Sequence, residues 1–221
     1  MSRSNERIMY WIDLGYMDYG KSLEIQRIIV EKRQVNALPD VLLTVEHPHV
    51  YTIGRRGKIE DVSQMTIPIV RVERGGSVTY HGPGQLVAYP IIKLDETQMD
   101  VHQLVNMLEE VGIHLLKDYN VVAERVVGKP GVWVKGKKIA SIGLAIKNWV
   151  TYHGIAININ VDLRYFHAIK PCGFSPDLIT SLNEILGREV SMNEIKQKFI
   201  QHFAKIFSVK LVEKMMDTIQ I

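Results

Sequence analysis

The sequence predicts an α+β fold, on three observations. Predicted strands and helices follow one another in an irregular order, without the regular β–α–β alternation of a parallel α/β sheet. The 221 residues are 46% hydrophobic and 23% charged, which is enough apolar material to bury one full-sized core. No internal repeat or low-complexity linker divides the chain. We therefore expect a single domain over residues 1–221.

The N-terminal half is expected to contain mainly strands. Ile8–Leu14 predicts a first strand, and the stretch from Asp18 to about Val35 predicts a helix with Leu23, Ile28 and Ile29 turned inward. Further strands are expected over Val41–Glu46, Val50–Ile53, Ile67–Val72 and Leu86–Ile92.

The C-terminal half combines helices with a hairpin. Asp100 and Gln103 form a capping box that starts a helix to about Tyr119, with Leu104, Val105, Leu108 and Leu115 inward. Val132–Val134 and Ile139–Leu144 flank a tip of solvated residues, Lys135-Gly136-Lys137-Lys138. A strand over Tyr152–Ile159 and a short turn or helix over Asp162–Ala168 follow. Capping boxes at Ser181 and Ser191 start the last helices, the second reaching about Phe207 with Ile195, Phe199, Phe203 and Ile206 inward.

Composition excludes several classes of protein. The net charge is only +3, with 27 basic and 24 acidic residues, so nucleic acid is not expected as a partner. No apolar run approaches the roughly 18 residues that span a bilayer, and we expect a cytoplasmic protein without a membrane partner. The single cysteine, Cys172, rules out an internal disulfide and a Cys-rich zinc cluster.

The segment Arg74–Gln85, RGGSVTYHGPGQ, concentrates the residues typical of a binding site. Its glycines allow close backbone approach to a ligand, and Arg74, Thr79, Tyr80 and His81 add hydrogen-bonding groups. The segment lies between extended runs, and the phosphate-loop pattern GxxxxGK[ST] is missing, so a nucleotide phosphate is disfavoured. The alternative is a glycine-rich hairpin whose His and Tyr side chains only pack.

Cys172 lies between Pro171 and Gly173, a turn context that favours a reactive thiol over an inert core cysteine. A free thiol with a pKa of about 8.5 is only a few per cent ionised at pH 7, so a nearby cation is needed. Candidates are His47, His81, His153 and the lysines at positions 135, 137 and 138, and the residues alone leave Cys–His and Cys–Lys pairing open. His47 and His49 flank a proline without a carboxylate at ligand spacing, which is more typical of a rigid turn than of a metal site.

Five blocks carry a resemblance to a known family. They are EHPHVYTIGRRG from Glu46, RGGSVTYHGPGQLVAYPI from Arg74, PGVWVKGKKIASIG from Pro130, YHGIAININVDL from Tyr152 and FHAIKPCG from Phe166. In this order they resemble the octanoyltransferase family, the lipoyl/octanoyl transferases of lipoate biosynthesis. The resemblance implies the fold of the biotin and lipoate protein ligase catalytic domains, a mixed, mainly antiparallel sheet flanked by helices.

The resemblance also implies roles for individual residues. The family's nucleophile falls on Cys172 and its lysine on Lys138, which would lower the pKa of the thiol. Lys137 supplies a second amine beside it. The family's acyl-binding segments fall on Arg74, Gly75, Gly76, Ser77, Val78, Thr79, Tyr80 and His81, on Ser141, Ile142 and Gly143, and on Gly154, Ile155 and Ala156. His47 and His153 are further candidates for lining the site.

The implied reaction moves an octanoyl group from acyl carrier protein, through a thioester on Cys172, to a lysine of a lipoyl domain. The acceptors would be lipoyl domains of 2-oxoacid dehydrogenase complexes and the glycine cleavage H protein, and no ATP, metal or other cofactor would be needed. Exposed Arg55, Arg56 and Lys58 would steer the acidic carrier. Two alternatives are an ATP-dependent lipoate protein ligase of the same fold, and a non-catalytic module that binds acyl carriers or lipoyl domains.

Overall fold

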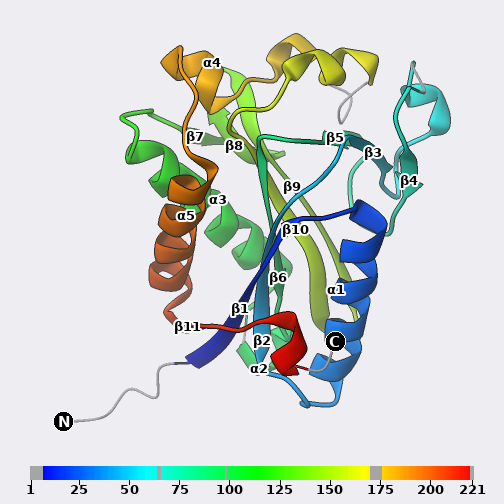
Figure 1. Ribbon diagram of the computed structural model, residues 1–221, viewed down its shortest axis with the longest axis vertical. Helices are drawn as coiled ribbons and strands as arrows, with labels where there is room; N and C mark the ends of the chain where they lie inside the picture. Colours follow the sequence, from blue (N-terminus) through cyan, green and yellow to red (C-terminus); the bar gives the residue numbers. More distant parts are fainter. Residues whose placement is uncertain (1–6, 64–65, 98, 170–175, 220–221) are drawn as a thin grey trace.

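The structure is a computed structural model that describes residues 7–63, 66–97, 99–169 and 176–219 (Figure 1). Its main feature is an eight-stranded sheet in the order β11-β1-β2-β6-β10-β9-β8-β7. The strands of this sheet are β1 (Arg7–Tyr16), β2 (Asp40–Glu46), β6 (Gln85–Ile91), β7 (Glu124–Val126), β8 (Lys129–Val134), β9 (Lys137–Lys147), β10 (Val150–Asn158) and β11 (Val209–Glu213). Only β1 makes parallel pairs in it, with β2 and β11, so the sheet is mixed and mainly antiparallel, as the resemblance implies.

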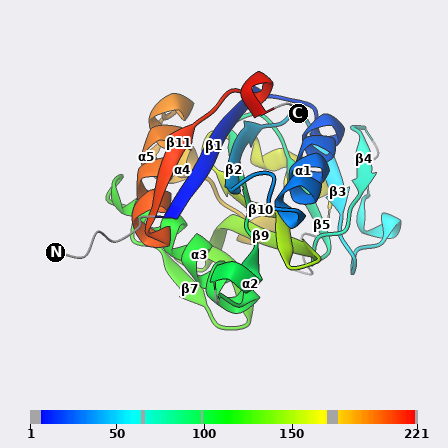
Figure 2. The same cartoon turned by 90° about the horizontal axis from the view of Figure 1, so that it is seen from below.

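Helices cover both faces of this sheet (Figures 1 and 2). The helices α3 (Val101–Lys117) and α5 (Met192–Phe207) pack on one face, and α1 (Tyr19–Gln34) packs on the other. Successive residues of the central strands alternate between the two faces: on β6, Leu86 and Ala88 belong to the α3/α5 core, whereas Val87 and Tyr89 belong to the α1 core. The short helices are α2 (Leu94–Thr97), α4 (Leu182–Leu186), η1 (Ile59–Asp61), η2 (Leu163–Ala168), η3 (Pro176–Leu178) and η4 (Met216–Ile219).

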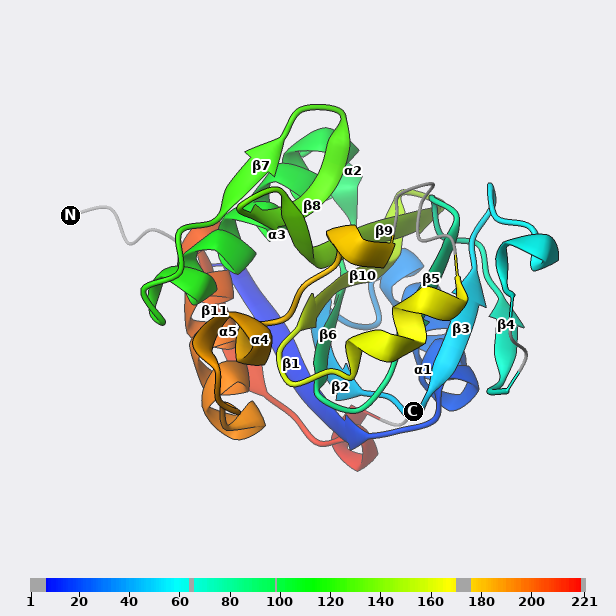
Figure 3. The ribbon, with the colours of Figure 1, turned by 90° about the horizontal axis from the view of Figure 1, so that it is seen from above.

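A smaller sheet lies beside the large one, in the order β4-β3-β5. Its strands are β3 (Val50–Ile53), β4 (Ile69–Arg71) and β5 (Val78–His81). They share a separate apolar cluster with η2, in which Tyr80 and Phe166 meet edge to face with ring centroids 5.2 Å apart. Seen from above, η2 and α4 lie over the end of the large sheet (Figure 3).

Hydrogen bonds at the helix starts confirm most of the expected caps. The Asp100 carboxylate accepts from the Gln103 N–H while the Gln103 side chain accepts from the Asp100 N–H, so the capping box of α3 is complete. Ser191 caps α5. The capping box expected at Ser181 is wrong, because the Ser181 hydroxyl donates to the Asn183 side chain instead of accepting from the helix.

Other expectations need correction. Ile28 is 40% exposed and not inward, whereas Leu23 and Ile29 are buried. Four of the twelve residues of the glycine-rich segment form strand β5, and the short strands β7 and β11 were not expected at all. No described helix is both long and apolar enough to cross a bilayer.

Candidate active site

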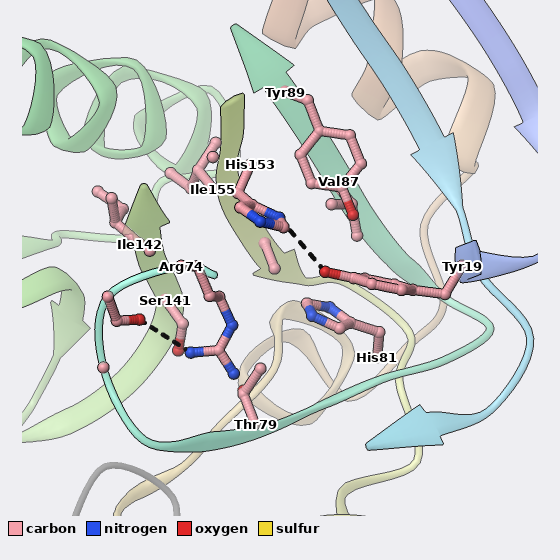
Figure 4. Close-up of a pocket in the computed structure, with 15 residues that line it drawn as sticks. Tyr19, Arg74, Thr79, His81, Val87, Tyr89, Ser141, Ile142, His153 and Ile155 are labelled. Atoms are coloured by element: carbon pink, nitrogen blue, oxygen red, sulfur yellow. Dashed lines mark hydrogen bonds between the residues drawn. The ribbon is translucent and has the colours of Figure 1, made fainter. Parts of the chain in front are cut away.

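A cavity opens where α1 begins, between the central parts of β6, β10 and β9 and the segment that precedes β5 (Figure 4). It encloses about 450 Å³ of unfilled space, including its mouth. The cavity is lined by Tyr19 of α1, Arg74, Gly75 and Gly76 before β5, Thr79 and His81 of β5, Val87 and Tyr89 of β6, Ser141, Ile142 and Gly143 of β9, and His153, Gly154, Ile155 and Ala156 of β10. The three segments that the sequence analysis selected, far apart in the chain, therefore meet around one space.

Three residues of the first segment do not line this cavity. Val78 and Tyr80 alternate with Thr79 and His81 along β5, so their side chains point to the opposite side, where they are fully buried in the apolar cluster of the small sheet. Ser77 also lies outside the lining, and its carbonyl accepts from the Gly54 N–H. The sequence predicted that the whole run Arg74–His81 lines the acyl site. Because β5 was not expected, the alternation of its side chains between two sides was not taken into account.

The ring side chains of the cavity are buried, and most of them have a hydrogen-bond partner. The Tyr19 hydroxyl lies 3.4 Å from His153 Nδ1, and the Tyr19 ring stacks on that of His81 (Figure 4). His81 Nδ1 lies 2.7 Å from Gln85 Oε1. His47 does not line the cavity but supports it from behind, through a 2.9 Å hydrogen bond between its Nε2 and the Tyr89 hydroxyl.

Burial keeps these groups uncharged. It lowers the pKa of His47 to about 4 and that of His153 to about 3, against an ordinary value near 6.5. For His81, burial and then the nearby His47 lower the pKa well below its ordinary value. Burial raises the pKa of Tyr19 to about 12. The rings are therefore neutral at pH 7, which suits an uncharged, largely apolar ligand.

Sequence analysis missed Tyr19, Val87 and Tyr89 as lining residues. Val87 and Tyr89 share one face of β6, so the two-residue period of this apolar run carried a signal. The sequence around Tyr19 contains no comparable signal, because only the packing of α1 against the sheet brings its ring to the cavity.

Arg74 is buried at the rim of the cavity, with only 6% of its surface exposed. One of its guanidinium nitrogens, Nη2, donates to both the carbonyl and the hydroxyl of Thr52, and Nη1 donates to the Gly75 carbonyl. These bonds hold the chain before β5 against β3. Arg74 therefore shapes the wall of the cavity.

The sequence predicted that Lys138 lies at an exposed hairpin tip, and this prediction is wrong. Lys138 belongs to β9 and is only 6% exposed, and its ammonium lies 5.6 Å from the centre of the Trp133 ring. Gly131 makes room for it: a Cβ at this position would lie 2.5 Å from Lys138 Cε and 2.3 Å from the Ala140 carbonyl oxygen. The prediction of solvent exposure is confirmed for the neighbouring Lys137.

The predicted nucleophile Cys172 lies outside the described residues. The chain that follows it returns to Lys138, whose carbonyl accepts from the Thr180 N–H at 3.0 Å. Lys138 also lines a second, outer hollow that shares Gly75, Gly76, Ile142 and Gly143 with the cavity. The two hollows are thus neighbours that have these four residues in common.

The two histidines before β3, His47 and His49, have separate hydrogen-bond partners. His49 Nδ1 lies 2.7 Å from the Tyr80 hydroxyl and its ring stacks on Tyr165, whereas His47 is bonded to Tyr89. In the part of the chain that the structure describes, no group of three or more His, Cys, Asp or Glu side chains is placed to hold a metal ion.

The chain is similar to several known proteins. Residues 18–204 match the family model of the lipoyl protein ligase A/B catalytic domain. An octanoyltransferase of Syntrophobacter fumaroxidans is 40% identical over 221 residues, which cover 97% of each chain. The structure of Ta0514, assigned as a lipoate protein ligase of T. acidophilum and solved with bound lipoic acid, is similar with a TM-score of 0.78 at 17% identity, over 95% of this chain and 92% of that one.

The biotin protein ligase of Aquifex aeolicus is similar more loosely, with a TM-score of 0.53 at 15% identity, over 90% of this chain and 68% of that one. These two structural likenesses confirm the fold that the resemblance implied. The family match and the close relative identify the chain itself. It belongs to the lipoyl protein ligase A/B catalytic domain family, and within that family to the octanoyltransferases.

Proposed function

We propose that this protein transfers an octanoyl group from acyl carrier protein to the target lysine of a lipoyl domain, through a thioester on Cys172. One observation carries the proposal: the apolar cavity and the hollow that contains Lys138 share the walls Gly75–Gly76 and Ile142–Gly143. An acyl chain held in the cavity would therefore present its carbonyl carbon toward Lys138.

The cavity is suited to a medium-length acyl chain. The side chains of Val87 and Ala156, on the α1 face of the sheet, provide apolar contacts, and the neutral histidine and tyrosine rings close its other side. Burying about six methylenes contributes roughly 5 kcal/mol, or about fourfold in affinity for each methylene. We infer that discrimination against shorter chains is gradual.

In the first half-reaction, the Cys172 thiolate attacks the thioester carbonyl carbon of the donor, the bond from that carbon to the carrier sulfur breaks, and the carrier sulfur takes a proton from Lys138 and leaves as a thiol. Lys138 supplies the positive charge that favours the thiolate. We propose a backbone N–H of Ser141–Gly143 as a donor to the oxyanion, because these residues line the cavity beside the strand position of Lys138.

In the second half-reaction, the ε-amine of the acceptor lysine attacks the acyl-enzyme, an amide bond forms and the Cys172 thiolate is released. The attacking amine gives up a proton, for which Lys138 is the proposed acceptor in a titration coupled to that of Cys172. Amide formation from a thioester is downhill, so we propose that the reaction uses neither ATP nor a metal. The proposed acceptors are lipoyl domains of 2-oxoacid dehydrogenase complexes and the glycine cleavage H protein.

Intact mass spectrometry after mixing with octanoyl acyl carrier protein, without ATP, tests this function. The wild type should gain one octanoyl group, and Cys172→Ser should gain none. Lys138→Ala should form the adduct at least about a hundredfold more slowly, within the range of general acid–base and electrostatic effects. The matched control is Lys137→Ala, since the exposed Lys137 precedes Lys138 and pairs only loosely with Glu184 at 3.7 Å.

Three results would contradict the proposal. An unchanged burst of acylation in Lys138→Ala would remove the role of this lysine. Adenylate formation from lipoate and ATP without a covalent enzyme would identify a ligase. Binding of the carrier with no adduct under any condition would leave a non-catalytic binding module.

A further inference from the structure

The hollow next to the cavity is a groove with its own chemistry. This outer groove is lined by Arg56, Gly75, Gly76, Val101, Val105, Gly128, Lys129, Pro130, Lys138, Ile142, Gly143 and Leu144, and contains about 1000 Å³ of unfilled space including its open side. It runs between α3, the β7–β8 turn and β9. It shares four residues with the cavity and contains Lys138, so a ligand bound in it lies against the lysine assigned to the proposed reaction.

The groove combines an apolar floor with positive charge. Val101, Val105 and Leu144 are half-buried in its walls, and Arg56, Lys129 and Lys138 supply three cations. Among the described residues that line it there is no carboxylate. Arg56 is exposed and forms no ion pair with another described residue, so its charge is available to a ligand.

We propose that the outer groove holds the phosphopantetheine arm of the acyl donor, with the arm's phosphate at Arg56 and Lys129. This inference rests on the proposed function, because it assigns a place to the part of the donor that does not enter the cavity. The arm is a long chain with an apolar dimethyl centre and two amides, and it ends in a negatively charged phosphate diester. An apolar floor between a buried reaction centre and exposed cations matches that order of groups.

The walls of the groove are fixed by backbone hydrogen bonds. The Arg56 N–H donates to the Gly76 carbonyl at 3.0 Å, and the Gly75 N–H donates to the Leu144 carbonyl at 2.9 Å. These bonds join the turn that carries Arg56 to β9, so the backbone at Arg56 is in place before the donor binds. The competing occupant is the acceptor lysine, which arrives as a cation in water, and the three positive charges disfavour it.

Two small acyl donors measure the contribution of the phosphate to donor recognition. Octanoyl-phosphopantetheine and octanoyl-pantetheine differ only in this group, so the ratio of their kcat/KM values for enzyme acylation measures its recognition. We expect the wild type to prefer the phosphorylated donor by about tenfold at low ionic strength, since each exposed charge pair contributes a few-fold. In the double variant Arg56→Gln/Lys129→Gln the ratio should fall to about two or less.

A control with the same loss of charge is Arg188→Gln/Lys210→Gln, because both side chains are exposed and lie outside the groove. This variant should keep the wild-type ratio. A ratio near one in the wild type, or an unchanged ratio in Arg56→Gln/Lys129→Gln, would overturn the assignment while leaving octanoyl transfer intact. Failure of the wild type to be acylated by any donor would overturn both the assignment and the proposed function.

A second variant distinguishes the donor from the acceptor. Val105→Trp fills the floor of the groove, so acylation by octanoyl-phosphopantetheine should slow by about tenfold or more relative to a short donor, octanoyl-N-acetylcysteamine, which lacks most of the arm. Transfer from preformed acyl-enzyme to a lipoyl domain reports the other half-reaction. Val105→Trp could instead slow this transfer and leave unchanged the ratio of acylation rates for octanoyl-phosphopantetheine and octanoyl-N-acetylcysteamine. In that case the groove holds the acceptor and the assignment is wrong.

Discussion

At the scale of single residues, the position of Lys138 depends on a glycine. Gly131 has φ of 126°, and a Cβ there would meet both the Lys138 side chain and the Ala140 carbonyl. We predict that Gly131→Ala displaces the lysine and slows acyl-enzyme formation by at least about tenfold, because catalytic groups must be held to within a fraction of an ångström. We therefore propose Gly131 as a positioning residue.

The control for this variant is Gly136→Ala in the turn of the same β8–β9 hairpin. Gly136 has φ of 79°, but a Cβ added there would have no neighbouring atom within 4 Å, so alanine carries the backbone cost without the collision. Stopped-flow acylation across a range of pH should show a slower rate and a shifted profile only in Gly131→Ala. Equal profiles in the two variants would mean that Gly131 has no role in placing Lys138.

At the scale of elements, the helix α3 carries one wall of the groove and depends on its cap. We predict that Asp100→Ala lowers the free energy of unfolding by about 1 kcal/mol, because the capping box at Asp100 and Gln103 is complete. Asp95→Ala removes the same charge from an exposed position nearby and should cost less than about 0.5 kcal/mol. Urea unfolding measures both values, and equal shifts would show that the cap contributes nothing.

The long elements were predictable because they are periodic and capped. The 3.6-residue pattern and the caps place α3 and α5 in the sequence, and apolar runs place β2 and β6. β5 was hidden because glycines precede and follow it, and β7 and β11 are short. The depth of Lys138 was not predictable, since the strand that contains it appears as the tip of a lysine-rich hairpin until Trp133 and Gly131 are seen beside it.

In the candidate site, too, some features were predictable from local sequence and others depend on packing. Glycine-rich and small-residue segments marked three walls of the cavity, and the resemblance supplied the roles assigned to Cys172 and Lys138. The ring of Tyr19 reaches the cavity only through the packing of α1 on the sheet. Local sequence identifies residues that can form a site, whereas long-range packing decides which of them meet.

At the scale of the whole molecule, three buried neutral histidines make folding sensitive to acid. The pKa values of His47 and His153 are lowered to about 4 and about 3, and that of His81 is also lowered. The unfolded chain binds protons at these rings below about pH 6.5, and the folded chain does not until the lower values are reached. Stability is therefore complete above about pH 6.5 and falls as the pH drops toward 4.

The size of this effect can be isolated with one variant and one control. Each buried histidine contributes about 1.4 kcal/mol per pH unit to the slope of unfolding free energy between about pH 6 and 4.5. His153→Gln should reduce that slope by about this amount, whatever it does to stability at pH 7, because a slope counts protons and is independent of lost contacts. His102→Gln changes an exposed side chain on α3 and should leave the slope as in the wild type. Urea unfolding at several pH values measures the slopes, and an unchanged slope in His153→Gln would show that this ring is not held neutral by the fold.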